Sequence, residues 1–253
     1  MRLLALPIHP LFVYDGKRKP LVKRGKSISQ YGTSIANEAS KKLLQLFGFP
    51  HHTAPGEAEA ECALLQKNGF VDAVMSEDVD TIMFGSSITL RSWSQEGQRG
   101  PQSLSHVAVH KLQDIKAKTG LDPDGMILVA LLSGGDYDGQ GVQGCGPALS
   151  CEVARAGFGA DLLEIIEKDD LRSLGEWRNR LQYELTTNES GYFRTKHKSV
   201  AIPQSFPDRT ILGHYAHPVV SSEGKVVKLE NEWIKIWETG VDIAELRRYV
   251  GRG

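Results

Sequence analysis

Acidic side chains are concentrated in one short part of the chain, residues 56–85, which reads GEAEAECALLQKNGFVDAVMSEDVDTIMFG. Six acids surround two apolar runs there: Glu57, Glu59, Glu61, Glu77, Asp78 and Asp80. Carboxylates that share a crevice raise one another's pKa and resist ionisation. Hard divalent cations reverse that cost, because Mg²⁺ and Mn²⁺ prefer carboxylate oxygens. Two such ions can activate a water and stabilise the leaving oxygen of a phosphodiester, so the acids predict metal-dependent phosphodiester chemistry.

The predicted strands place several acids at one edge of a sheet. Asp15 follows the apolar and aromatic run 9–14, and Asp78 follows the apolar run 70–75; both runs are predicted as buried strands. In parallel α/β sheets, ligands bind outside the carboxyl ends of the strands. Asp78 and Asp80 are two residues apart, so in extended chain both would face one site. Asp136 follows an apolar helix end and is expected to complete the group.

Glu57 and Glu59 belong to a different element. A helix is predicted to begin after Pro55-Gly56, where the helix dipole favours acids in the first turn. Residues two apart in a helix do not share a face. Either the helix terminus splays the two side chains toward the site, or one of them acts at longer range.

Each acidic motif has a simpler interpretation when it is taken alone. EAEAE is usually a solvated helix start, the Asp-x-Asp pair at 78–80 is often a turn or a cap, and Asp15-Gly16 is a common turn. The metal-site hypothesis depends on the joint order of strand–Asp–Gly, GEAEAE, SEDVD and GGDYDG along one chain.

The net charge of −1 conceals a strong asymmetry between neighbouring segments. Residues 1–50 carry a net +7, whereas residues 51–80 carry a net −6. This arrangement fits a polyanion held beside metal ions, although two solvated faces would have the same composition. The basic residues that we take as candidate DNA contacts are Lys17, Arg18, Lys23, Arg24, Arg194, Lys196 and Lys198. For the last three, a solvated loop is the alternative.

Composition excludes a membrane partner and favours a soluble globular class. Of the 253 residues, 40% are hydrophobic and 24% are charged, and no apolar run approaches the roughly 20 residues that span a bilayer. Three cysteines without Cys-x-x-Cys spacing favour a reduced intracellular compartment.

The order of the predicted elements indicates an α/β protein with a mostly parallel sheet flanked by helices. Further strands are expected at 82–84 and 88–93, and helices at 107–119 and 124–132. A glycine-rich turn, 139–149, leads into a helix through Ala156. The remainder is expected to be helical to about Leu185, irregular through Val220, and helical again to Val250.

Five motifs resemble the XPG-type structure-specific nucleases, which include the flap endonucleases. They are FVYDGKRKP, APGEAEAECALL, VMSEDVDTIMFG, LLSGGDYDGQGVQGCGPA and FPDRTILGHYAHPVVS. The matches run in order from about Pro10 to Val250. The spacing in DYDGQGVQGCG and the short basic segment after Asp15 are similar to the Gen/Yen-type Holliday junction resolvases.

The resemblance implies a PIN-like sheet and a two-ion magnesium site, at which manganese substitutes. The residues implied to bind the metals or to surround them are Asp15, Glu57, Glu59, Asp78, Asp80 and Asp136. It also implies that either Lys23 or Arg24 reaches the scissile phosphate. The expected substrate is branched double-stranded DNA, in the nucleus, with a homodimer on four-way junctions.

The resemblance further implies a helix–two-turn–helix DNA-binding element at about 136–158, with K⁺ as a possible ligand of its turn. Gly141, Gly144 and Gly146 would let backbone N–H groups approach phosphates. The expected division is a nuclease core at 1–100, an internal nuclease region at 101–200, and a C-terminal extension of the nuclease domain at 201–253.

The family normally begins earlier, with a strand that carries another catalytic Asp. We therefore expect this chain to lack the N-terminal portion of the nuclease domain. Two hypotheses follow: a metal-dependent endonuclease in DNA repair and recombination, or a catalytically inactive DNA-binding fragment of one. A phosphatase of small phosphate esters is a third and weaker alternative.

Overall fold

The computed structural model describes residues 3–20, 22–23, 26–27, 34–94 and 106–251, and in this part the strands form three small sheets. The parallel pairs are β1 (Phe12–Tyr14) with β4 (His51–Thr53) and β5 (Val74–Met75) with β6 (Ile88–Ser94). The antiparallel pairs are β6 with β7 (His106–Lys111) and β2 (Val22–Lys23) with β3 (Lys26–Ser27). The predicted α/β class is confirmed, although the sheet is divided.

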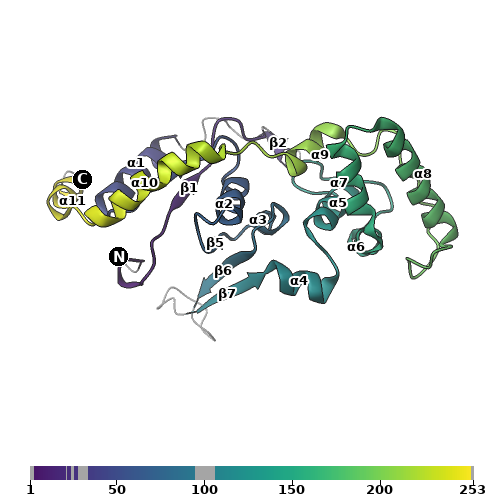
Figure 1. Ribbon diagram of the computed structural model, residues 1–253, viewed down its shortest axis with the longest axis horizontal. Coiled ribbons are helices and arrows are strands. Elements are labelled where there is room, and N and C mark those ends of the chain that lie inside the picture. The colour runs from purple at the N-terminus through teal and green to yellow at the C-terminus, as the bar shows by residue number, and fades with distance from the viewer. Residues whose placement is uncertain (1–2, 21, 24–25, 28–33, 95–105, 252–253) are drawn as a thin grey trace.

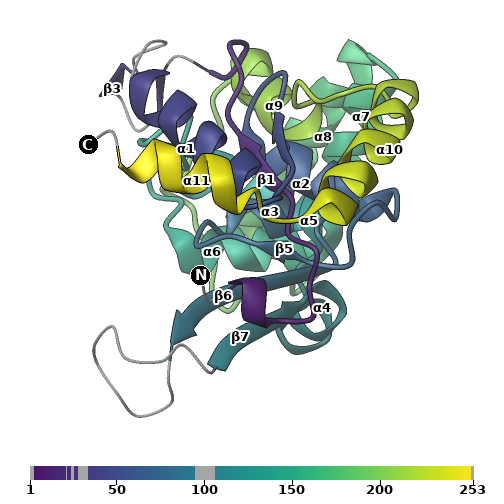
Figure 2. The same ribbon diagram turned by 90° about the vertical axis from the view of Figure 1, so that its left-hand side faces the viewer.

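Helices make up most of the rest of the described chain (Figure 1). In chain order they are η1 (Leu3–Ala5), α1 (Ser34–Leu46), α2 (Ala58–Lys67), α3 (Asp80–Met83), α4 (Leu112–Thr119), α5 (Pro123–Ser133), α6 (Pro147–Val153), η2 (Ala154–Phe158), α7 (Gly159–Glu167), α8 (Leu171–Thr187), α9 (Arg209–Ala216), α10 (Glu223–Thr239) and α11 (Ile243–Val250). Helices α1, α10 and α11 gather at one end and α5–α9 at the other, as Figures 1 and 2 show. None of the described helices has the length and apolar character needed to cross a bilayer.

The larger hydrophobic core is built around α5. This helix is apolar on all sides, which is typical of a helix buried within a core. It contacts α3, α6, α7 and α9, and Leu128 and Leu132 are fully buried within it. Trp177 of α8 closes the core and donates its indole N–H to the Phe158 carbonyl over 3.0 Å. The C-terminal end of α5 is therefore a fixed support for the acidic turn that follows it.

A smaller core joins α2 to α10 and contains a buried polar network. Glu61 is fully buried and accepts hydrogen bonds from two distant segments. Its Oε1 lies 2.8 Å from His52 Nε2 on β4, and the backbone N–H of Ser221 donates to its Oε2 over 2.8 Å. Trp233 of α10 packs edge-on against the His52 ring. The network ties α2, which contains Glu59 and is preceded by Glu57, to β4 and to the chain just before α10.

Two predicted elements proved wrong in type. Residues 82–84 were expected as a strand, but they form the end of α3 and its C-cap, Phe84. The Asp78 carboxylate accepts the Asp80 N–H and starts the helical turn there. Residues 107–119 were expected as one helix, but their first part is β7 and only Leu112–Thr119 is helical. Pairing of β7 with β6, which lies earlier in the chain, decides the conformation of that part.

Other elements differ in extent or were missed. The run 70–75 contributes only two residues to β5, and the run 9–14 only three to β1. Strand β4 was not predicted, because His51-His52 lacks an apolar pattern, although its pairing with β1 is regular. Helix α9 lies in the segment that was expected to be irregular, and it begins where the Asp208 carboxylate accepts the N–H groups of Thr210 and Ile211.

We expect Leu128→Ala to lower the free energy of unfolding by about 2–5 kcal/mol, because the cavity would lie in the centre of the larger core. Chemical denaturation measures this loss. Leu171→Ala is the matched control: Leu171 is 62% exposed, and its truncation should change stability by less than about 0.5 kcal/mol. Equal losses from the two variants would contradict the assignment of the core.

We expect Glu61→Gln to lower the free energy of unfolding by about 1–3 kcal/mol at pH 7, because an amide N–H₂ group would face one of the two donors. Burial alone would raise the pKa of Glu61, but hydrogen bonds from His52 and Ser221 outweigh it and leave the pKa lowered. A lowered pKa means that the stabilisation is present above the ordinary value of 4.5 and is lost as the pH falls through the folded-state value.

The difference between wild type and Glu61→Gln should therefore shrink in urea titrations below about pH 4.5. Glu232→Gln, on the exposed side of α10, is the control and should match wild type at every pH. A difference for Glu61→Gln that is constant from pH 7 to pH 3 would contradict the ionised buried network.

Candidate metal centre

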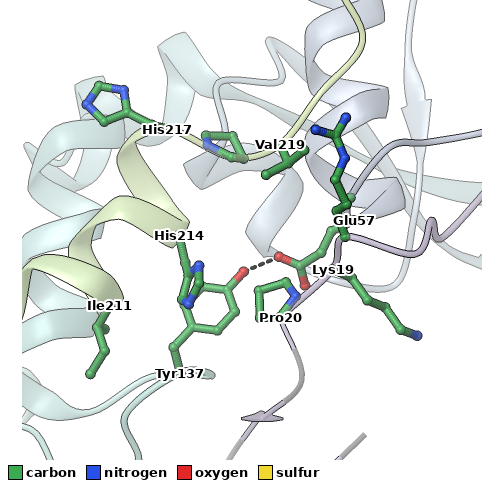
Figure 3. Close-up of a pocket in the computed structure, with 11 residues that line it drawn as sticks. Lys19, Pro20, Glu57, Tyr137, Ile211, His214, His217 and Val219 are labelled. Carbon is green, nitrogen blue, oxygen red and sulfur yellow. Dashed lines mark hydrogen bonds between the residues drawn. The ribbon is translucent and has the colours of Figure 1, made fainter. Parts of the chain in front are cut away.

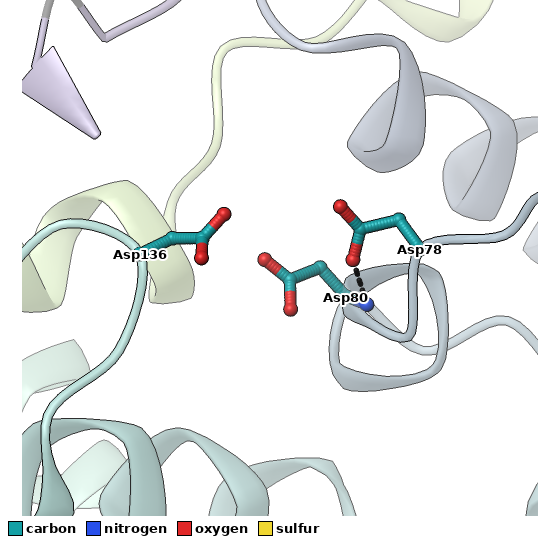
Figure 4. A group of neighbouring side chains, drawn as sticks. All are labelled: Asp78, Asp80 and Asp136. Atoms are coloured by element: carbon teal, nitrogen blue, oxygen red, sulfur yellow. Dashed lines mark hydrogen bonds between the residues drawn. The ribbon is translucent and has the colours of Figure 1, made fainter. Parts of the chain in front are cut away.

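Three carboxylates converge at one place on the surface of the described chain. Asp78, Asp80 and Asp136 each present an oxygen, and these oxygens all lie within 4.8 Å of one another. All three side chains are partly buried, and Figure 4 shows Asp136 facing the other two from a separate loop. Like charges this close repel one another, and a divalent cation between them would relieve that repulsion.

The local backbone explains how Asp78 and Asp80 share a site. Asp78 follows β5, and its Oδ1 accepts the backbone N–H of Asp80 over 3.0 Å. Asp80 is the first residue of α3, so the pair is not extended and the predicted reason for its alignment was wrong. The hydrogen bond fixes one Asp78 oxygen and directs the two carboxylates to the same side (Figure 4).

Asp136 reaches the cluster through a tight turn at the end of α5. Gly134 begins this turn with φ +88°, and a Cβ atom there would lie 2.8 Å from the Gly139 carbonyl oxygen. Glycine is needed at Gly134 on both counts. A backbone hydrogen bond closes the turn: the N–H of Gly135 donates to the Asp138 carbonyl oxygen over 2.6 Å.

Glu57 lies beside this turn and not at the solvent surface. It is 4% exposed, and its Oε2 accepts a hydrogen bond from the Tyr137 hydroxyl (Figure 3). Burial raises the pKa of Tyr137, and the Glu57 carboxylate raises it further, so the phenol remains a donor. The same two residues border a cavity of about 410 Å³ whose rim carries Arg18 and Lys19. A basic rim thus adjoins the acidic centre.

The remaining predicted acids lie around the cluster and are not among its three converging members. Glu59 lines an open hollow together with Asp78 and Arg91, so the start of α2 does splay Glu57 and Glu59 to different places. Asp15 accepts hydrogen bonds from the N–H of Ala58 and from Lys19 Nζ, at 2.9 and 3.1 Å. Its carboxylate therefore caps the N-terminus of α2.

The predicted DNA contacts lie partly outside the described residues. Arg24 lies outside the described residues, and for Lys23 only the backbone, in β2, is described. Lys17, Arg18, Lys196 and Lys198 are exposed. Arg194 is also exposed, and its Nε lies 3.4 Å from Glu152 Oε1 of α6.

The glycine-rich turn connects α5 to α6 as the sequence predicts. Gly141 has φ +59°, and a Cβ atom there would lie 2.4 Å from the Leu132 carbonyl oxygen, so this glycine holds the turn against α5. Gly144 has φ +85°, whereas Gly146 is exposed and precedes the first residue of α6. The exposed face of the turn is available to a ligand.

The donor set fits a hard divalent cation. Three aspartate oxygens from two separate loops can approach one ion, and carboxylates are the preferred ligands of Mg²⁺ and Mn²⁺. Thiols do not take part, because the three members are all aspartates. The residues present therefore suit the metal that the acidic motifs predicted.

The sequence interpretation missed the tyrosines that support the cluster. Tyr137 and Tyr215 are both buried, with ring centroids 4.5 Å apart, and the Tyr215 hydroxyl accepts the N–H of Asp136. Burial raises the pKa of Tyr215 to about 12; the charges of Asp80 and Asp136 add to this, and backbone hydrogen bonds oppose it. Tyr137 could have been suspected from its place within GGDYDG, but Tyr215 carries no local signal.

Comparisons with known proteins agree with this geometry. A family model for the XPG I-region matches residues 48–136, which include five of the six predicted acids. Flap endonuclease 1 of Encephalitozoon cuniculi is 32% identical over an alignment of 211 positions, and the match covers 70% of this chain and 58% of that protein. The GEN1 junction-resolving enzyme, solved with product DNA and Mg²⁺, is 49% identical with a TM-score of 0.79, covering 98% of this chain and 56% of that one.

A structure of the Rad2 catalytic core is 30% identical with a TM-score of 0.57, and the match covers 87% of this chain and 69% of that core. The chain belongs to the XPG family of structure-specific nucleases. It spans little more than half the length of the flap endonuclease and of the GEN1 chain that it matches.

We expect Asp78→Asn to weaken Mn²⁺ binding at least about tenfold, because the amide keeps the acceptor for the Asp80 N–H but removes one charge from the cluster. Electron paramagnetic resonance of free Mn²⁺, without DNA, measures the affinity. Asp72→Asn, on the exposed chain before β5, should bind Mn²⁺ as wild type does. Equal affinity in both variants would place the ion elsewhere.

Proposed function

We propose that the chain is a metal-dependent endonuclease that hydrolyses phosphodiesters in branched DNA. The observation that carries the proposal is the convergence of Asp78, Asp80 and Asp136 within 4.8 Å. Membership of the XPG family and the likeness to GEN1 with product DNA and Mg²⁺ support the same activity.

In this proposal the three aspartates hold the metal, and Glu59 serves the same centre from the hollow that it shares with Asp78. Glu57 and Asp15 support the centre by fixing Tyr137 and the start of α2. Bound divalent ions would supply an activated water and neutralise charge on the phosphate. Lys23 or Arg24 is assigned to the scissile phosphate.

The basic and glycine-rich surfaces are assigned to the DNA backbone. Arg18 lies on the rim of the cavity beside Glu57, and its neighbour Lys17 is exposed. The turn that contains Gly141, Gly144 and Gly146 precedes the N-terminus of α6. Backbone N–H groups at such a turn bind phosphates. Arg194, Lys196 and Lys198 would extend that contact along a duplex.

The kind and number of metal ions and the DNA substrate are proposed from the similarity to GEN1 and the flap endonucleases. Structures of GEN1 have been determined with Mg²⁺ and Mn²⁺ together and with potassium. We assign two Mg²⁺ ions, replaceable by Mn²⁺, to the acidic centre and K⁺ to the glycine-rich turn. Action on Holliday junctions and 5′ flaps, a homodimer on four-way junctions, and DNA repair and recombination in the nucleus belong to the same proposal.

The test is cleavage of a labelled 5′ flap and a labelled four-way junction, with Mg²⁺ and with EDTA. We expect cleavage only with Mg²⁺, and we expect Asp136→Asn to reduce the rate by more than about 100-fold, since a direct ligand should matter more than its neighbours. Asp138→Asn is the matched control in the same turn; its Oδ1 accepts the Gln140 N–H, which the amide preserves.

A second outcome is possible because the chain spans only part of its relatives. DNA binding without cleavage in any divalent metal would support the catalytically inactive DNA-binding fragment. Cleavage that survives EDTA, or equal rates in Asp136→Asn and Asp138→Asn, would contradict the proposed centre.

A further inference from the structure

The turn that carries Asp136 is held by a hydroxyl group from a distant helix. Tyr215 lies on α9, 79 residues later in the chain, and is 3% exposed. The backbone N–H of Asp136 donates to Tyr215 Oη over 3.1 Å. A buried hydroxyl oxygen therefore accepts the backbone amide of the residue whose carboxylate faces Asp78 and Asp80.

The lack of a side chain at Gly135 leaves room for the Tyr215 hydroxyl. A Cβ atom at Gly135 would lie 2.5 Å from Tyr215 Oη and 3.1 Å from Ala130 Cβ. Unlike Gly134, Gly135 does not have a positive φ, so the backbone conformation alone would accept alanine. Space for the tyrosine hydroxyl is therefore the physical reason for glycine at this position.

The contact also connects the turn to α2. The rings of Tyr215 and Tyr137 pack with centroids 4.5 Å apart, and the Tyr137 hydroxyl bonds to Glu57 at the start of α2. The Asp136–Tyr137 turn is thus clamped between α9 on one side and α2 on the other. A cation that needs ligand oxygens in a narrow shell requires such a fixed backbone.

We propose that Tyr215 is a positioning residue that holds the Asp136 carboxylate within reach of the cation bound by Asp78 and Asp80. This inference rests on the proposed metal-dependent function. It extends the centre beyond residues 48–136 to α9, which would act on the metal through the backbone without touching it. Loss of the hydroxyl should loosen the turn and leave the ring packed.

The first test is Tyr215→Phe, with two readouts that need no DNA. Mn²⁺ affinity, measured by electron paramagnetic resonance, should fall about tenfold, as is typical when a group behind a ligand is removed. Hydrogen exchange of the Asp136 amide in metal-free protein should accelerate at least about tenfold, because its acceptor is gone. The unfolding midpoint should move by less than about 5 °C.

Tyr183→Phe is the matched control. Tyr183 lies on α8 and is 52% exposed. The substitution removes a hydroxyl there too, in this case one that donates to the Glu189 carboxylate. Its Mn²⁺ affinity and its Asp136 exchange rate should equal those of wild type.

The second test combines Gly135→Ala with Tyr215→Phe. Gly135→Ala alone should weaken Mn²⁺ binding, because the new methyl group displaces the hydroxyl and the turn. In the Tyr215→Phe background, Gly135→Ala should reduce the Mn²⁺ affinity by a smaller factor, because the hydroxyl oxygen that the new methyl group would meet is absent. Gly135→Ala leaves Tyr215 in place, so it also tests the inference if Tyr215→Phe does not fold. For that single variant, unchanged Mn²⁺ affinity contradicts the role.

Unchanged Mn²⁺ affinity in Tyr215→Phe, or strictly additive losses in the two variants, would overturn the inference. Its failure is distinguishable from that of the proposed function. If wild type binds Mn²⁺ and Tyr215→Phe binds it more weakly but neither cleaves DNA, the endonuclease proposal fails and the positioning role stands. If wild type binds no Mn²⁺, the metal centre and the role of Tyr215 at it both fail, whatever the exchange rates show.

Discussion

Repulsion between three carboxylates is the interaction on which the organisation of the centre depends. Oxygens of Asp78, Asp80 and Asp136 lie within 4.8 Å of one another, so their like charges repel. The hydrogen bond from the Asp80 N–H to the Asp78 carboxylate offsets part of that repulsion, and the bond from the Asp136 N–H to Tyr215 holds the turn in place. A bound divalent cation would neutralise the remaining repulsion, because hard divalent ions take carboxylate oxygens as ligands.

Rigid supports behind the carboxylates make such a cluster possible. Asp136 follows the end of α5, an apolar helix that packs against α3, α6, α7 and α9. Helix α2 is fixed through buried Glu61, whose partner Ser221 lies 160 residues away. The centre therefore draws its geometry from segments spread over most of the described chain, and the acidic residues alone do not determine it.

Local signals predicted much of this arrangement. Acids after apolar runs, the acid-rich helix start and the glycine-rich turn all correspond to observed features, and Asp78, Asp80 and Asp136 meet as expected. Two departures have long-range causes. Strand β7 forms where a helix was expected, because it pairs with β6, and strand β4 forms without an apolar pattern, because it pairs with β1. Tyr215 could not be inferred, since a tyrosine in an amphipathic helix gives no indication of a partner 79 residues earlier.

Anomalous diffraction from crystals of this chain grown with Mn²⁺ would test the central claim most directly. The account predicts a manganese peak between the carboxylates of Asp78, Asp80 and Asp136, bonded to oxygens at about 2.0–2.3 Å, as hard divalent ions require. Ordered carboxylates in the same positions with no anomalous peak between them, at a saturating manganese concentration, would contradict it.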